Sequence, residues 1–249
     1  YKGKSMTEQK FSLQETIKRE SNYLAGDIAS ELADSSTNDV SDATYELLKF
    51  HGSYFGHNRD TATERKKAGL EKEYEFMVRT RIPGGRLTAA QYLAMDELAE
   101  KYANGTLRIT TRQVFQFHVV LKKDLKAHIA AINRALLSTQ SGCGDVVRNI
   151  TCSPAPYKNA RYERLRQDVE RVAEFVRPKA MRYRELWLDE EKDEVRERSV
   201  GEPLYGDTYM PRKFKIGIIL PEDNSVDVFT HDMGIVAIYE GETLAGYNI

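Results

Sequence analysis

An alternation of side chains along residues 75–82 constrains the fold most. Apolar or small side chains occupy every second position and mostly basic ones lie between them: Phe76, Val78, Thr80 and Ile82 against Met77, Arg79 and Arg81. Successive side chains of a β-strand point to opposite faces, so this alternation predicts a strand with one apolar and one basic face. Pro83-Gly84-Gly85 then predicts a turn.

The segments after this turn predict the rest of a small α+β unit. Thr88 and Gln91 have the spacing of a capping box, and the helix that they begin is expected to close at Asn104-Gly105. Strands are predicted at 107–110 and 114–121, and a second helix begins at Asp124. Strand, helix, strand, strand, helix is the order of a ferredoxin-like unit, an antiparallel sheet with helices on one face.

The remaining segments are less regular. Apolar spacing predicts helices at 11–32 and 161–175, and strands at 181–188, 214–220 and 235–239. His51 and His57 fall in a predicted loop, 143–157 in a junction, and 189–198 in a charged surface excursion. We expect three parts: an N-terminal arm and helix (1–45), the ferredoxin-like half-domain (46–142), and the first part of a mixed α/β domain (143–249). Because residues 244–249 end within an apparent strand, we expect a chain that has been cut short.

Bulk composition excludes several classes of protein. Lys and Arg (37) nearly cancel Asp and Glu (38), so no global charge attracts nucleic acid or an anionic membrane. No apolar run approaches the roughly 20 residues of a membrane-spanning helix. The cysteines, Cys143 and Cys152, match neither a metal motif nor a disulfide framework. We therefore expect a cytoplasmic protein, or a plastid one if a transit peptide was removed, with no nucleic-acid or membrane partner.

The polar face of the predicted sheet is the main candidate site. Residues two apart share a face, which pairs Arg79 with Arg81, Arg108 with Thr110, and Gln116 with His118. Arg112 lies in the adjoining turn. A solvated face is one interpretation, but four arginines without an acid repel one another unless anions lie among them. Guanidinium groups bind oxyanions through paired hydrogen bonds, so the composition favours a polyanionic ligand.

Other candidates each have a simpler alternative. Lys213 and Lys215 also share a predicted strand face, although lysines commonly guard an exposed sheet edge. Arg148 alone is typical of a salt-bridge partner, and His118 of a hydrogen-bonded structural residue. His51 and His57 have no cysteine or acid at metal-ligand spacing, so no metal is assigned to the side chains of this chain.

Five segments, in order, resemble the siroheme-dependent sulfite and nitrite reductases. They are Phe50-His51-Gly52-Ser53-Tyr54, the segment from Met77 to Gly85, the segment from Arg108 to His118, Arg148-Asn149-Ile150, and the segment from Pro211 to Lys215. The resemblance covers most of the chain from residue 50 onward. It implies six-electron reduction of sulfite to sulfide, or of nitrite to ammonia, at siroheme coupled to a 4Fe-4S cluster. The electron donor would be ferredoxin or an NADPH-dependent flavoprotein.

The resemblance also implies roles for the basic residues. Arg79, Arg148, Lys213 and Lys215 match residues around the bound anion and are expected to be catalytic. Residues that match the siroheme-binding positions, or neighbour them, are Arg81, Arg108, Thr110, Arg112, Gln116, His118 and Asn149. Two lysines at 213 and 215 favour sulfite, since nitrite reductases usually carry a neutral amide at the position of Lys215.

The same resemblance implies that this chain is incomplete as an enzyme. The family holds its cluster with four cysteines in the second half, so the ligands are expected there and this piece alone is expected to be inactive. The competing interpretations are an RRM-like RNA-binding module and a regulator that keeps the half-fold without chemistry. An RRM stacks bases on exposed aromatic rings, whereas Phe115 and Phe117 are predicted to face the core.

Overall fold

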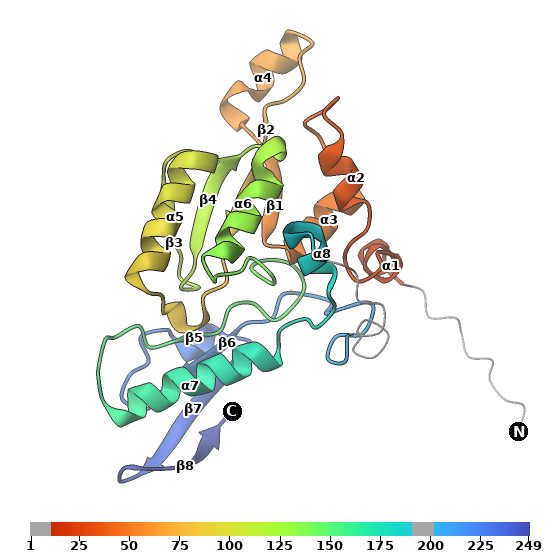
Figure 1. The fold of residues 1–249 in the computed structure, drawn as a ribbon. Coiled ribbons are helices and arrows are strands. Elements are labelled where there is room, and N and C mark those ends of the chain that lie inside the picture. Colours follow the sequence, from red (N-terminus) through yellow and green to blue (C-terminus); the bar gives the residue numbers. More distant parts are fainter. Residues whose placement is uncertain (1–10, 191–201) are drawn as a thin grey trace, which may run out of the picture.

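The structure is a computed structural model that describes residues 11–190 and 202–249. It contains two four-stranded sheets (Figure 1). In the first, the strand order is β1-β2-β4-β3 and all neighbours are antiparallel. Its strands are β1 (Ser53–His57), β2 (Tyr74–Arg79), β3 (Leu107–Ile109) and β4 (Phe115–Val120). The mixed α+β class predicted from the sequence is confirmed.

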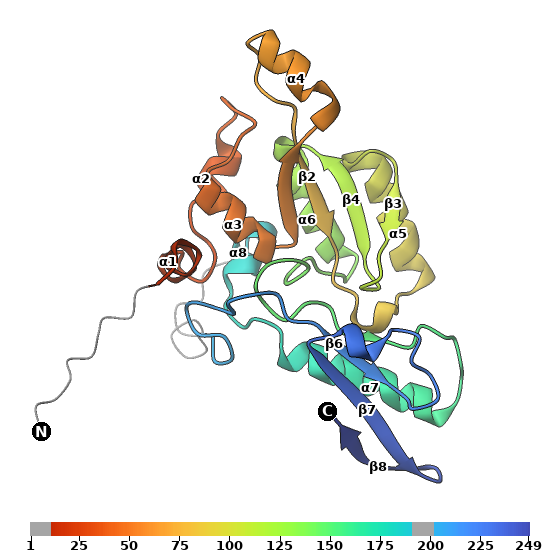
Figure 2. The same ribbon diagram turned by 180° about the vertical axis from the view of Figure 1, so that it is seen from behind.

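Helices cover one face of this first sheet and leave the other without helices (Figure 2). The covering helices are α5 (Ala89–Tyr102) and α6 (Lys122–Arg134). Phe76, Val78 and Phe117 point between them and are at most 1% exposed, as are Leu125 and Ile129 of α6. Burying each of these side chains stabilises the fold by about 2 kcal/mol. The helix-free face is therefore the one available to a ligand.

The predicted start of α5 is confirmed in detail. The Thr88 hydroxyl accepts a hydrogen bond from the Gln91 backbone N–H, and the Gln91 side chain accepts one from the Thr88 N–H. This reciprocal capping satisfies two backbone donors that the first turn of a helix leaves unpaired.

The second sheet has the order β5-β6-β7-β8 and is mixed. Its strands are β5 (Thr151–Cys152), β6 (Ile216–Ile219), β7 (Met233–Glu240) and β8 (Thr243–Asn248). The first three pair in parallel and the last is antiparallel. The helix α7 (Ala160–Phe175), which the sequence predicted, packs on β5 and β6, and η2 (Val228–Thr230) precedes β7.

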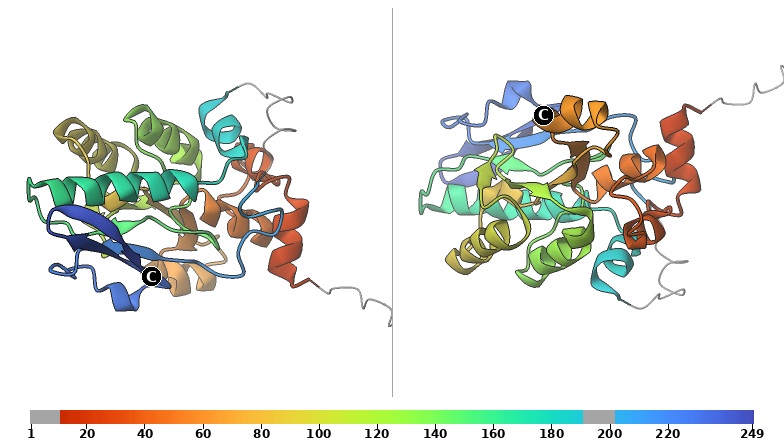
Figure 3. Two further views of the ribbon diagram at one scale, coloured as in Figure 1. Left: turned by 90° about the horizontal axis from the view of Figure 1, so that it is seen from below. Right: turned by 90° about the horizontal axis from the view of Figure 1, so that it is seen from above.

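The N-terminal helices differ from the prediction. The single helix expected at 11–32 is two helices, α1 (Leu13–Glu20) and α2 (Ile28–Ala33). Asn22, Tyr23 and Leu24 between them have positive φ, which ends the first helix. The helix α3 (Asp42–Phe50) follows. These helices gather with α8 (Arg182–Leu188) at one end of the molecule, away from β7 and β8 (Figure 3).

Three other local predictions are wrong. Residues 181–188 form the helix α8 (Arg182–Leu188) rather than a strand, because Trp187 and Tyr183 are buried at helical spacing. The predicted loop around His51 and His57 contains β1, and α4 (Arg59–Lys67) follows it. Strand alternation would place Val119 on the apolar face with Phe115 and Phe117, but Val119 has a φ of 62° at an irregularity in the β2–β4 pairing and is 39% exposed.

Three further points complete the fold. The charged excursion predicted at 189–198 lies almost entirely outside the described residues. Within the described ranges, no helix is both long enough and apolar enough to cross a bilayer. The 3-10 turn η1 (Pro83–Gly85) follows β2, and Gly84 there has a φ of 61°, a conformation that favours glycine.

Candidate functional site

A row of three polar residues crosses the first sheet on one face. Gln116 of β4 lies opposite Arg79 of β2 on one side and opposite Arg108 of β3 on the other. Directly paired residues of an antiparallel sheet project to the same face, and His118, two residues along β4, joins them. The buried neighbours Val78 and Phe117 point the opposite way. The predicted alternation therefore brings Arg79, Arg108, Gln116 and His118 together.

Gln116 links the arginine to the histidine. With its amide oxygen turned toward Arg79, it accepts hydrogen bonds from the arginine Nε, at 3.1 Å, and Nη2. This orientation is required because the opposite one would place amide N–H groups against guanidinium N–H groups. The amide nitrogen then donates to His118 Nε2 at 3.2 Å. Burial, followed by the charges of Arg108 and Arg79, lowers the pKa of His118, so the ring is neutral and accepts this bond.

Arg79 and Arg148 converge on one thiol and one phenol. Arg79 Nη1 lies 3.2 Å from Cys143 Sγ, and the Arg79 guanidinium lies over the Tyr54 ring at 5.7 Å. Arg148 Nη2 is 3.5 Å from the Tyr54 hydroxyl. Burial raises the pKa of Cys143, and the two arginines only partly oppose that effect. The thiol is therefore protonated and adds no negative charge between the arginines.

Backbone carbonyls hold Arg148 in place. Its side chain is buried, with Nε donating to Gly144 O at 2.7 Å and Nη1 directed at Gly142 O at 3.4 Å. Gly142 is required because a Cβ there would come within 2.5 Å of the Arg79 carbonyl oxygen. The close approach of these backbones sets the spacing of the two arginines.

A short parallel pairing brings the two lysines beside Arg148. Val147 and Phe214 form a β-bridge, and Arg148 N donates to Phe214 O at 2.8 Å. Lys213 and Lys215 flank Phe214, so both belong to the chain that runs along Arg148. Lys213 is exposed and Lys215 is half-buried. The alternation predicted at 213–216 agrees with the burial of Ile216.

Arg112 lies in the turn between β3 and β4 and reaches the second sheet. Its Nη1 is 3.3 Å from Thr151 Oγ1. Thr110 shapes the turn, since its hydroxyl accepts from the Arg112 backbone N–H at 3.2 Å. Burial is the main cause that lowers the pKa of Arg112; Arg148 lowers it further and Asp232 opposes both. The positive charges of Arg112 and Arg148 therefore repel each other.

The cations of this site have no acidic partners within salt-bridge distance. Among residues 11–190 and 202–249, no carboxylate lies within 4.0 Å of the charged nitrogens of Arg79, Arg108, Arg112, Arg148, Lys213 or Lys215. By contrast, Arg164, Arg177 and Arg182 elsewhere all have such partners. A cluster of unpaired cations on an otherwise balanced protein favours an anion.

Two predicted site residues lie apart from this group. Arg81 follows the end of β2, is 5% exposed, and its Nη2 donates to Ala173 O at 2.6 Å at the end of α7. The expected pairing of Arg79 with Arg81 on one strand face therefore does not occur, because β2 ends at Arg79. Burial lowers the pKa of Arg81 to about 10.

The side chain of Asn149 forms its hydrogen bonds with backbone groups. The Ile82 N–H donates to Asn149 Oδ1 at 3.0 Å, while Nδ2 donates to Ile82 O at 2.7 Å and to Arg112 O at 3.0 Å. Asn149 is 1% exposed, so its structural contribution is to fix the turn that carries Arg112.

Sequence reasoning did not assign roles to three residues at this site: Tyr54, Thr151 and His231. Tyr54 stands in a segment that carries the family resemblance, and Thr151 follows another such segment, so proximity to those motifs was a usable signal. His231 had none, because it reaches Thr151 only through the pairing of β5, β6 and β7.

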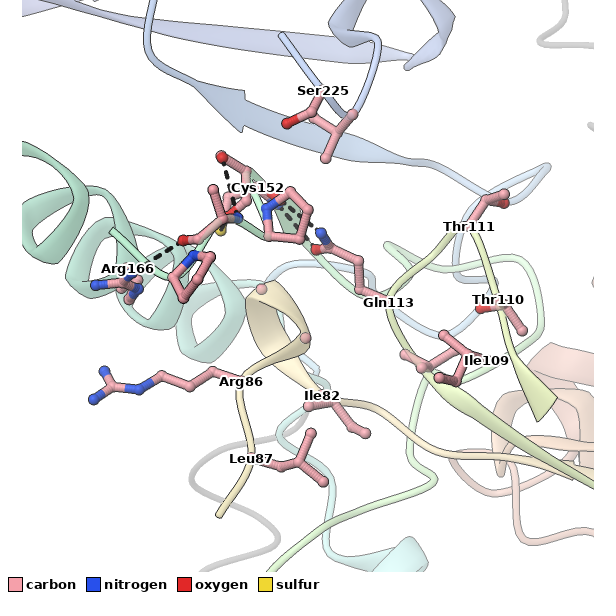
Figure 4. Close-up of a pocket in the computed structure, with 18 of the residues that line it drawn as sticks. Ile82, Arg86, Leu87, Ile109, Thr110, Thr111, Gln113, Cys152, Arg166 and Ser225 are labelled. Atoms are coloured by element: carbon pink, nitrogen blue, oxygen red, sulfur yellow. Dashed lines mark hydrogen bonds between the residues drawn. The ribbon is translucent and has the colours of Figure 1, made fainter. Parts of the chain in front are cut away.

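A large open cavity of about 1280 Å³ adjoins the site. It lies between η1, the 109–115 turn and the start of α7, and Figure 4 shows Gln113 hydrogen-bonded to Cys152 within it. Of the predicted site residues only Thr110 lines it. Strand alternation would place Ile109 on the apolar face with Leu107, but Ile109 is 78% exposed at the rim of the cavity, so that expectation is wrong. The cavity is beside the cation cluster and not at its centre.

Two family descriptions match the chain. Residues 69–135 match the nitrite/sulfite reductase ferredoxin-like half domain, and residues 143–249 match the nitrite and sulphite reductase 4Fe-4S domain. The first covers β2 to α6 and the second covers the second sheet with α7 and α8.

Individual relatives agree with these matches. A sulfite reductase [NADPH] hemoprotein beta-component of Staphylococcus saprophyticus is 47% identical over 235 residues, and one of Anoxybacillus flavithermus is 49% identical over 235. Each alignment covers 94% of this chain and 41% of the relative, so the chain spans less than half the length of these proteins. The NirA protein of Mycobacterium tuberculosis has the same fold, with a TM-score of 0.67 at 18% identity over 96% of this chain and 40% of that one.

Proposed function

We propose, because the chain belongs to the nitrite and sulfite reductase family, that the protein containing it reduces sulfite to sulfide. One observation carries the proposal. The charges of Arg79 and Arg108 both act on His118, those of Arg79 and Arg148 on Cys143, and those of Arg112 and Lys215 on His231. None of these cations has an acidic partner within salt-bridge distance among the described residues. Such a surface suits an anionic cofactor and an oxyanion substrate together.

The residues present fit siroheme, which carries many carboxylates. Arg108 is exposed on the helix-free face, and Arg112 is half-buried beside it. Arg112 Nη1 points to Thr151 Oγ1 and Ile216 O, and the other N–H donors of this guanidinium are available to a ligand. Guanidinium groups bind carboxylates in a bidentate manner. We propose that Arg108, Thr110, Arg112, Gln116 and His118 line the siroheme site. When bound, siroheme supplies the iron at which sulfite is reduced.

Arg81 and Asn149 have a different place in this proposal. Both were predicted to contact the cofactor, and we propose that both act through the backbone that they hold. Asn149 binds the carbonyl of Arg112 itself, whereas Arg81 ties the end of β2 to α7.

The residues present do not fit a 4Fe-4S cluster. Such a cluster requires four thiolate ligands, whereas the chain contains two cysteines. Both are buried, and burial raises the pKa of Cys143 and raises that of Cys152 to about 11. The family description names a 4Fe-4S domain, so we propose that the cluster ligands lie in the part of the relatives that this chain does not span.

The substrate site is proposed to consist of Arg79, Arg148, Lys213 and Lys215. The two arginines are held at fixed positions by Gln116, Tyr54 and backbone carbonyls, so their remaining N–H groups can bind oxyanion oxygens without reorganisation. Lys213 and Lys215 lie on the neighbouring segment, and each carries an ammonium group with N–H donors. Because each sulfite oxygen leaves as water, we propose that Lys213 and Lys215 donate protons from Nζ to the departing oxygens.

The names of the relatives support a proposal for the electron donor. Their names include NADPH, so we propose that NADPH supplies the electrons through a flavoprotein rather than that ferredoxin does. We also propose the division into an arm at 1–45, a half-domain at 46–142, and the start of the cofactor domain at 143–249.

The visible absorption spectrum of the whole protein tests the function. Protein purified from cells that make siroheme is expected to show a Soret band and a red-region band, both of which shift when sulfite is added. A colourless protein that binds RNA would instead support the RRM-like alternative. Phe115 and Phe117 are 5% and 0% exposed, so they offer no stacking surface to bases.

Replacing Lys215 tests the choice of sulfite over nitrite. Lys215→Asn is expected to lower kcat/KM for sulfite by about 100-fold, because one charged donor to the oxyanion is lost. Nitrite reduction should fall much less. Lys179→Asn is the matched control, since that lysine already pairs with an acid, Glu174, near the end of α7. If both substrates lose activity equally, Lys215 does not select sulfite.

A further inference from the structure

His231 stands between two segments that the proposed site uses. It follows η2 and precedes β7, and its ring lies over β6, where a Cβ on Gly217 would approach the ring atoms Cδ2 and Nε2 to 3.0 Å. His231 Nδ1 is 3.1 Å from Asp227 O, and Nε2 is 2.9 Å from Thr151 Oγ1. Each ring nitrogen therefore has one partner.

The partners decide where the protons lie. A backbone carbonyl only accepts, so His231 Nδ1 carries the proton and Nε2 is an acceptor in the neutral ring. The Thr151 hydroxyl then donates to His231 Nε2, while its oxygen accepts from Arg112 Nη1 at 3.3 Å. The result is a continuous chain from Asp227 O through His231 and Thr151 to Arg112.

Protonation of His231 would change that chain. Nε2 would become a donor, so Thr151 would have to turn its own proton to Ile216 O, 3.4 Å away. The Thr151 oxygen would then accept from two cations, His231 and Arg112. An anion bound by Arg112 would offset that repulsion. Protonation of the His231 ring would therefore be favoured when Arg112 binds an anion.

The charges around the ring act in opposite directions. Arg112 from the β3–β4 turn and Lys215, which precedes β6, oppose protonation, whereas Asp227 favours it. The neighbouring Asp232 accepts from Lys215 N at 2.7 Å and acts on Arg112. Burial, as the largest cause, lowers the pKa of His231. Burial and the charge of Arg112 therefore both favour the neutral ring.

We propose that His231 is a positioning residue: through Thr151 it orients Arg112, and a carboxylate or oxyanion bound by Arg112 is coupled to uptake of one proton at His231. The proton comes from solvent and stays on Nε2. The proposal rests on the proposed function only for the nature of the anion at Arg112.

Sulfate binding measured against pH tests the coupling. The whole protein would be made in cells that cannot synthesise siroheme, which leaves Arg112 free, and sulfate does not titrate between about pH 5.5 and about pH 7.5. The affinity is obtained from the rise of Tm with sulfate at constant ionic strength. We expect sulfate to bind about fivefold more tightly at the lower pH.

Four variants locate the effect. His231→Asn and Thr151→Val should bring the ratio of the two affinities close to one, whereas Thr151→Ser, which keeps the hydroxyl, should restore it. Gly217→Ala should also abolish the ratio by displacing the ring. Gly246→Ala is its control, because a Cβ at Gly246 meets nothing within 4 Å.

A ratio that is unchanged in both His231→Asn and Gly217→Ala would overturn the proposal, and so would Thr151→Val behaving as wild type. His118 is a second imidazole near Arg79 and Arg108, and its protonation could also make sulfate binding depend on pH. The ratio of the two sulfate affinities must therefore remain in His118→Gln. These results do not depend on sulfite reduction. If the protein binds siroheme in cells that make it but shows no pH effect, only this proposal is overturned. If it shows the pH effect but takes up no siroheme in such cells, only the proposed function is overturned.

Discussion

At the scale of single residues, buried histidines make stability depend on pH. His128 is 0% exposed, its ring nitrogens have no partner among the described residues, and burial lowers its pKa from 6.5 to about 4. Because the folded-state pKa lies below the unfolded one, its stabilisation is complete above pH 6.5 and is lost as the pH falls toward 4. At about pH 5 this loss is about 2 kcal/mol. His128→Phe, which keeps the edge contact with Phe117, should remove that part of the acid sensitivity in urea unfolding.

The His51 ring remains as an internal control for this measurement. Burial also lowers its pKa to about 4, and it accepts a bond from Trp187 Nε1 at 2.8 Å. Its contribution should persist unchanged in His128→Phe. If the variant loses as much unfolding free energy on acidification as wild type does, His128 is not neutral in the folded protein.

At the scale of elements, Asn149 joins the turn after β2 to the turn after β3. Asn149→Ala would leave Ile82 N and Arg112 O without their partner, while Ile82 O would keep its bond from the Gly85 N–H, so we expect a loss of about 3 kcal/mol in the free energy of unfolding. Asn58→Ala is the matched control, since Asn58 caps the exposed helix α4 and makes one exposed bond to Glu73, so the substitution should cost about 1 kcal/mol. Equal losses in the two variants, measured by urea unfolding, would show that Asn149 does not hold the turns together.

At the scale of the whole molecule, nearly balanced charges hide a local cation cluster. Divalent oxyanions should therefore stabilise the protein more than chloride does at the same ionic strength, raising Tm by about 3 °C. Arg79→Gln combined with Lys215→Gln should abolish the difference. Arg161→Gln combined with Arg177→Gln should keep it, because those arginines already pair with Glu222 at 3.4 Å and Glu174 at 2.9 Å. An equal loss in both double variants would mean that sulfate acts on the surface generally.

Local regularities were predictable because they depend on neighbouring residues. The capping box at Thr88, the alternation around Arg79 and the helix predicted from Asp124 each depend on residues a few positions apart. All three appear in the structure, the last as α6. The gathering of Arg79, Gln116 and Arg108 follows from strand alternation once β2, β4 and β3 are neighbours. The family resemblance added the proposal of a siroheme enzyme to these patterns.

By itself, the sequence therefore determined the chemical character of the site: basic residues on one strand face, without acids among them. Tertiary structure alone decided which of them meet. Arg81 was separated from Arg79 because β2 ends and the chain turns toward α7, and residues 181–188 became helical because Trp187 is buried beside His51. The contact of Arg112, Thr151 and His231 joins residues as much as 119 positions apart, from 112 to 231. No local pattern encodes such a contact, because it exists only when two sheets pack and their loops close on one another.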